Sequence, residues 1–131
     1  MILKAVLPRG RIIARRQRNF ACYAAHFDRV LGAKPLFVLN SAQTARIVPY
    51  VFPLWVDEPD RVYQALRDQE LPVFRWDRIW PGTPRLDGDF GPLWSHHVLQ
   101  LLCHQDLSQA DVTRTSRAVL GLLPTKQLSQ Q

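Results

Sequence analysis

The sequence has few cysteines and no long apolar run. Its 131 residues include two cysteines, Cys22 and Cys103, which is too few for a disulfide-stabilised scaffold. No apolar stretch approaches the roughly 20 residues that a membrane-spanning helix needs. These absences predict a soluble chain with reduced thiols and no membrane segment, and we expect it to be cytoplasmic.

Acidic residues are almost absent from the first part of the chain. Residues 1–31 hold seven basic residues and one acid, Asp28, whereas residues 32–131 hold ten of each sign. The whole formal net charge of +6 therefore comes from the first segment. This distribution indicates a local electrostatic feature rather than a uniformly basic protein.

Residues 9–31 have the periodicity of a long amphipathic helix, and Gly32 suits its C-terminal cap. Four arginines of this helix are candidates for binding an anionic partner: Arg11, Arg15, Arg16 and Arg18. Because Arg16 falls on the apolar side, we expect it to be paired, to extend its charged end to water, or to be covered by something outside this chain. The alternatives to an anionic partner are a solvated helix face or contact with a missing domain. No stacked-aromatic or helix-turn-helix pattern favours nucleic acid.

The rest of the chain alternates between short strands and helices. Strands are predicted at 35–39, 47–56, 71–76 and 98–103, helices at 57–69 and from 108 to 123, and a helical turn at 93–97. Ser108 and Asp111 have the spacing of a capping box. Pro49 and Pro53 would leave one strand edge without N–H donors, so we expect that edge to be free or bulged there.

This order of elements favours an α+β fold, with a small mostly antiparallel sheet and helices packed on one face. We expect one domain over residues 1–131, ending in a polar tail at 124–131. The Pro-, Gly- and Asp-rich segment 77–92 is a long connection, and such loops often carry function.

A mixture of charged and aromatic side chains begins that connection. Its members are candidates for a substrate-facing loop: Arg75, Trp76, Asp77, Arg78 and Trp80. The alternative is a surface loop held in place by buried tryptophans, and the sequence alone favours neither. His96-His97 and Cys103-His104 match no standard zinc spacing, so we expect no metal site.

Several stretches, in order, resemble the C-terminal small domain of the DegT/DnrJ/EryC1/StrS family of pyridoxal-phosphate (PLP) dependent sugar aminotransferases. The basic run 15–19 resembles the helix that leaves the family's large domain, and 48–57 resembles its first long strand. Residues 62–73 resemble the following helix and returning strand, and 99–108 resembles the leucine-rich strand before a serine-capped terminal helix. The resemblance covers residues 9–123.

The resemblance implies the small domain of an aspartate-aminotransferase-fold enzyme. In such enzymes a large domain binds PLP as a Schiff base to a lysine, and the amino group passes to a keto group, typically of a nucleotide-linked sugar. Homodimers are typical of the family, so the resemblance implies a homo-oligomer. It also implies that PLP belongs to the full enzyme.

The chain departs from the family at the cofactor. Its only lysines, Lys4, Lys34 and Lys126, stand in no cofactor motif, and no Gly-rich phosphate cradle is present. Trp76 or Asp77 replaces the histidine that the family often has after the returning strand. We therefore expect this chain to hold no catalytic residue and no cofactor alone, and to need a partner bearing the large domain. The alternatives are a non-enzymatic interaction module with the same fold and a basic nucleic-acid-binding domain.

Overall fold

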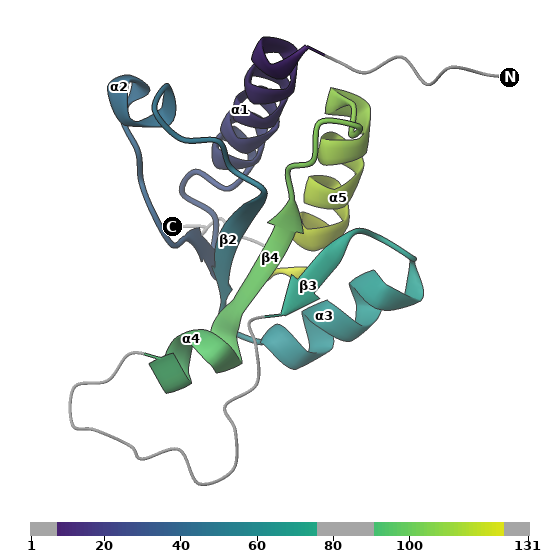
Figure 1. Ribbon diagram of the computed structural model, residues 1–131. Helices are drawn as coiled ribbons and strands as arrows, with labels where there is room; N and C mark the ends of the chain where they lie inside the picture. The colour runs from purple at the N-terminus through teal and green to yellow at the C-terminus, as the bar shows by residue number, and fades with distance from the viewer. Residues whose placement is uncertain (1–7, 76–90, 125–131) are drawn as a thin grey trace, which may run out of the picture.

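A computed structural model describes residues 8–75 and 91–124 (Figure 1). Along the chain the elements are α1 (Arg9–His26), β1 (Ala33–Pro35), α2 (Ser41–Thr44), β2 (Val51–Val56), α3 (Pro59–Asp68), β3 (Val73–Arg75), α4 (Gly91–His97), β4 (Val98–Leu102) and α5 (Gln109–Leu122). No helix in these two ranges is long and apolar enough to cross a membrane.

The four strands form one antiparallel sheet in the order β1-β2-β4-β3. In the register of the two central strands, Phe52 lies opposite Leu101 and Leu54 lies opposite Leu99. All four of these side chains are buried. The sheet confirms the predicted α+β fold with antiparallel strands.

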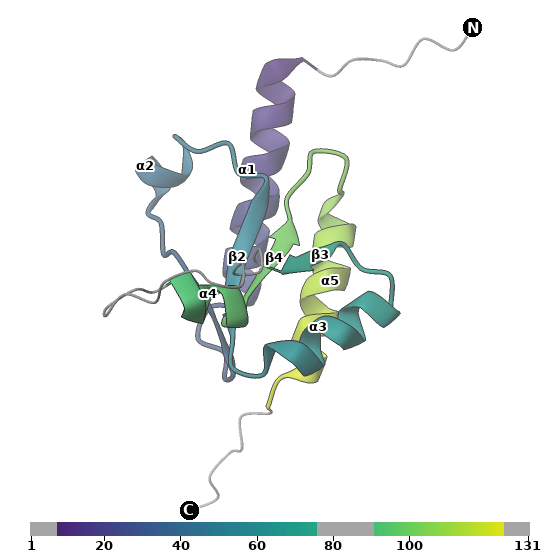
Figure 2. The same cartoon turned by 60° about the horizontal axis from the view of Figure 1, so that its bottom comes forward.

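Helices α1, α3 and α5 cover one face of the sheet (Figures 1 and 2). Strand β2 alternates between buried and half-buried residues, as expected when one face of a sheet meets the core. Phe52 is the centre of this core, because two aromatic rings of α1 and the ring of Phe27, which follows the helix directly, rest on its ring. The centroid distances are 5.0 Å from Phe20, 5.5 Å from Tyr23 and 6.3 Å from Phe27. The three- and four-residue spacings place these rings on one side.

A buried amide joins α1 to the connection between β4 and α5. The side-chain Nδ2 of Asn19 donates to the carbonyls of Cys103, His104 and Leu107 at 3.1–3.2 Å. The hydroxyl of Tyr23, one turn later, donates to the Leu102 carbonyl at 2.9 Å. These bonds give partners to the carbonyl groups at the end of β4 and in the connection that follows. They therefore hold the start of the connection against α1.

The predicted N-terminal cap of α5 is confirmed. The Ser108 hydroxyl accepts from the backbone N–H of Asp111, and the Asp111 carboxylate accepts from the backbone N–H of Ser108. The buried residues of α5 are Val112, Thr115, Ser116 and Val119, which form the inner face of the helix.

The end of α1 differs from the prediction. The helix ends at His26, and Gly32 is not its cap. Arg29 and Gly32 have φ angles of 56° and 84°, and the Gly32 carbonyl accepts from the Asp57 N–H at 2.9 Å. Two left-handed residues let the chain reverse into β1, which a continued helix would prevent.

The first two strands differ from the prediction. Strand β1 lies at 33–35 rather than 35–39, so the two overlap only at Pro35, and β2 begins at Val51 rather than at residue 47. The pairing of β1 with β2 ends at Pro35 opposite Leu54. One further bond runs from the Leu36 N–H to the Pro53 carbonyl at 3.1 Å, and Pro53 has no N–H to donate in return. The polar connection at 40–46 contains the short helix α2. Asn40 and Gln43 cap it through a capping box, a signal that the sequence reading missed.

Candidate functional site

Arg75 ends β3 and is the one candidate of the substrate-facing loop that the structure describes. Its Nη1 lies 2.6 Å from Oδ1 of Asp60, and its Nη2 donates to the His96 carbonyl at 2.7 Å. Its guanidinium carbon lies 5.5 Å from the ring centroid of Tyr63. Three contacts therefore hold this side chain between the end of β3, helix α3 and helix α4.

The guanidinium of Arg75 lowers the pKa of the neighbouring Asp60 carboxyl. The larger cause is the hydrogen bond that the guanidinium donates, and the second is its positive charge. Both stabilise the ionised carboxylate and hold its pKa below the ordinary value. The remaining loop candidates, Trp76, Asp77, Arg78 and Trp80, lie outside the described residues.

The structure divides the four candidate arginines of α1 into two pairs. The Nε of Arg16 donates to Oε1 of Gln105 at 2.8 Å, and its guanidinium lies 5.5 Å from the Tyr50 ring centroid. Arg18 donates to the Leu107 carbonyl at 3.2 Å. Both side chains thus contact the region around the β4–α5 connection, and the expected pairing of Arg16 is confirmed.

Arg11 and Arg15 form the second pair. In the described part of the chain, neither side chain makes a hydrogen bond or an ion pair. Arg11 is exposed and Arg15 is half-buried. They are therefore the arginines of the four that are free to meet a partner.

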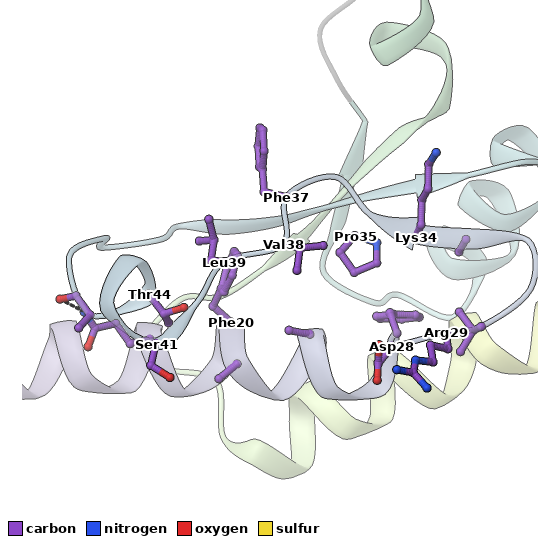
Figure 3. A pocket seen from close by; sticks show the side chains of 17 residues that line it. Phe20, Asp28, Arg29, Lys34, Pro35, Phe37, Val38, Leu39, Ser41 and Thr44 are labelled. Carbon is purple, nitrogen blue, oxygen red and sulfur yellow. Dashed lines mark hydrogen bonds between the residues drawn. The ribbon is translucent and has the colours of Figure 1, made fainter.

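An apolar groove of about 730 Å³ runs between α1 and the segment 33–45 (Figure 3). Two alanines of α1, Ala21 and Ala24, line it and leave room between the helix and the segment. Figure 3 shows Leu39 over Phe20 along the groove. The volume lies within the range of ligand pockets. In Figure 3, the labelled hydroxyl and charged side chains lie toward the two ends of the groove.

Aromatic side chains gather on the sheet face opposite α1. The Trp55 ring stacks on the His97 ring with centroids 4.3 Å apart and planes 11° apart. The Lys34 ammonium lies 5.6 Å from the Trp55 centroid, and the Trp55 indole N–H donates to Asp57 at 3.3 Å. The sequence reading missed this cluster. Trp55 could have indicated the cluster, because it points to the same side of β2 as Val51 and Pro53, away from the core.

The described residues do not fit PLP. A Schiff-base lysine needs a phosphate-binding loop and an acid facing the pyridine nitrogen. Lys34 is the only lysine in the described ranges, and it lies exposed on edge strand β1 over the Trp55 ring. No three His, Cys, Asp or Glu side chains of residues 8–75 and 91–124 gather in a group that could hold a metal ion.

No protein-family model matches the sequence, and no curated protein matches it. Solved structures do match. The chain superposes on the aminotransferase TlmJ from Streptoalloteichus hindustanus with a TM-score of 0.63 and 18% identity, over 86% of this chain and 32% of that chain. It superposes on DesI, solved in the presence of its TDP-sugar product, with a TM-score of 0.66 and 19% identity, over 85% of this chain and 31% of that chain.

A DegT DnrJ EryC1 StrS aminotransferase from Brucella abortus also matches, with a TM-score of 0.63 and 15% identity, over 87% of this chain and 32% of that chain. The chain has the fold of part of an aminotransferase. The resemblance drawn from the sequence is therefore confirmed at the level of the fold. The chain spans about a third of the length of the solved structures that it matches.

Proposed function

We propose that this chain is a detached or truncated small domain of a PLP-dependent aminotransferase-like protein and is inactive alone. The observation that carries the proposal is the superposition of most of the chain on one third of several aminotransferases. The cofactor lysine would lie in the larger part, because the described residues of this chain offer no PLP site.

Exposed apolar side chains support this proposal. Large apolar side chains remain exposed on the described part of the molecule: Leu31, Phe37, Val38, Val48, Tyr50, Phe74 and Leu93. Phe74 lies opposite Gln100 in the register of β3 and β4, on the face away from the buried Val73 and Leu101. Exposed apolar residues of this kind are expected where another domain packs.

In the full protein, we propose that the amino group passes to a keto group of a nucleotide-linked sugar. DesI was solved with its TDP-sugar product, which supports this substrate class. The loop that starts at Arg75 would then shape substrate choice, together with Trp76, Asp77, Arg78 and Trp80. We also propose a homo-oligomer, as the resemblance implies, and a cytoplasmic location, as the low cysteine content favours.

Co-purification tests the proposal. The reading frames that flank the gene are searched for a lysine-bearing PLP domain, which is then co-expressed with this chain. We expect the two proteins to form a complex with PLP-dependent amino-transfer activity that the larger protein lacks alone. If no such frame exists, or if the larger protein is fully active alone, a non-enzymatic interaction module replaces the proposal.

A further inference from the structure

The connection between β4 and α5 contains a histidine whose ring closes a turn of the backbone. The backbone N–H of Asp106 donates to Nδ1 of His104 at 3.1 Å, two residues back along the chain. Asparagine and aspartate make the same bond in Asx turns, where a side-chain oxygen accepts from the N–H two residues on. Because Nδ1 accepts this bond, it carries no proton, and the ring is neutral with its proton on Nε2.

The same nitrogen has a second partner within reach. Oδ2 of the Asp106 carboxylate lies 3.5 Å from Nδ1 of His104. This contact becomes a hydrogen-bonded ion pair only when Nδ1 holds a proton, whereas the bond from the backbone N–H requires that Nδ1 holds none. The two interactions therefore exclude each other, and one proton decides which of them forms. An imidazole gains or loses this proton between about pH 5 and pH 8.

The turn is coupled to α1 through Gln105, which lies between the two partners. Oε1 of Gln105 accepts from Nε of Arg16 at 2.8 Å. The ring centroid of Tyr50 lies 5.5 Å from the Arg16 guanidinium carbon and 6.0 Å from the His104 ring centroid. No ion pair among the described residues involves Arg16. A positive charge on His104 would therefore act on a nearby guanidinium that no acid of the described chain neutralises.

The charged groups on the surrounding elements leave Asp106 as the acid of this turn. Helix α1 contributes Arg18, which adds positive charge beside the turn by donating to its last carbonyl at 3.2 Å. Helix α5 contributes Asp111, which is engaged in the helix cap and lies 3.7 Å from Arg114. The side chain of Asp106 is 78% exposed and that of His104 is 26% exposed, so the carboxylate has room to move toward the ring.

We propose that His104 is a proton-operated switch that releases Arg16 from the β4–α5 connection. At neutral and higher pH, the unprotonated Nδ1 closes the turn and Gln105 holds Arg16. In acid, Nδ1 takes a proton from water, loses the Asp106 N–H and binds the Asp106 carboxylate. The turn then opens and moves Gln105, while the new charge on His104 repels the guanidinium. The inference does not depend on the proposed function, because it requires only residues of this chain.

Nuclear magnetic resonance of the full chain tests the switch. At about pH 8, the nitrogen chemical shifts of the His104 ring should show the tautomer with its proton on Nε2. As the pH is lowered to about 5, the Asp106 amide and the Arg16 Nε–H should shift with the same midpoint as the ring. Solvent protection of the Arg16 Nε–H, relative to that of exposed Arg11 at the same pH, should fall by about fivefold, the order expected when one hydrogen bond is lost.

A matched pair of variants separates the switch from general effects of acid. His104→Asn keeps an acceptor for the Asp106 N–H but cannot be protonated, so Arg16 should stay protected down to about pH 5. His26→Asn makes the same change at the end of α1, away from the turn, and should leave the Arg16 transition unchanged.

Three results would overturn the proposal. The first is a His104 ring with its proton on Nδ1 at about pH 8, a measurement that needs no variant. The second is a His104 ring that titrates while the Arg16 Nε–H keeps its protection. The third is an Arg16 transition that persists in His104→Asn, which would place its cause outside this imidazole.

Discussion

The side-chain amide of Asn19 lies 3.2 Å from the backbone carbonyl of Leu107, across 88 residues of sequence. The same amide reaches two more carbonyls of the β4–α5 connection, and Asn19 is fully buried. One side chain of α1 therefore holds the turn from which α5 starts.

Asn19→Ala should consequently destabilise the fold. The substitution leaves buried carbonyls without their donor, which costs about 2 kcal/mol in the free energy of unfolding. Urea denaturation measures this value. Gln64→Ala is the control, because it removes an exposed hydrogen bond to Asp68 and should cost under about 0.5 kcal/mol. Similar losses in both variants would show that the Asn19 bonds do not stabilise the turn.

Backbone conformation predicts opposite effects at two positions. Gly32 has a φ of 84°, and a Cβ there would lie 2.7 Å from Cδ of Pro124. Gly32→Ala should therefore destabilise the protein by about 1–2 kcal/mol. Glu70 has a φ of 57° after the end of α3, so Glu70→Gly should stabilise it by up to about 1 kcal/mol. Thermal unfolding of the two variants compares the signs, and two shifts in the same direction would contradict this reading.

The Asp60–Arg75 pair predicts acid sensitivity. Because Arg75 lowers the pKa of folded Asp60, this carboxylate favours folding above its ordinary pKa of 3.8. The contribution is lost as the pH falls through the lower pKa of the folded state. The melting temperature should fall as the pH is lowered from about 5 to about 2, and this fall should be smaller in Arg75→Met than in the unchanged protein. The pKa of Asp111 is also lowered, by hydrogen bonds from Ser108. The loss of stability that its protonation causes should be the same in Arg75→Met and in the unchanged protein.

The two cysteines should differ in reactivity. Burial raises the pKa of the Cys103 thiol to about 12, so almost no thiolate forms there at neutral pH. Cys22 is half-buried. Treatment with iodoacetamide at about pH 8, followed by mass spectrometry, should modify Cys22 alone in the folded protein and both cysteines in urea. Modification of folded Cys103 at the same rate as Cys22 would contradict the burial.

Local patterns predicted much of the fold because they depend on neighbouring residues. The capping box of Ser108 and Asp111 needs only a three-residue spacing, and helix α1 needs only a periodic apolar face. The end of α1 could not be predicted in this way. Val30 and Leu31 continue its apolar pattern, and the reversal at Gly32 depends on contact with Asp57, which follows strand β2.

The candidate site was predictable only in part for the same reason. The sequence indicated that Arg16 needs a partner, but Gln105 lies 89 residues away. Arg75 was selected as a loop residue, and its partners Asp60 and His96 follow only from the packing of α3 and α4. That the side chains of Arg11 and Arg15 lack partners among the described residues likewise follows only from the folded structure.

The most direct test of the central claim is whether this chain can hold the coenzyme covalently. The purified protein is incubated with PLP, reduced with borohydride, digested and analysed by mass spectrometry. The account predicts no stoichiometric adduct on Lys4, Lys34 or Lys126, because the cofactor lysine lies in a larger domain. A stoichiometric phosphopyridoxyl group on one of these lysines would contradict it.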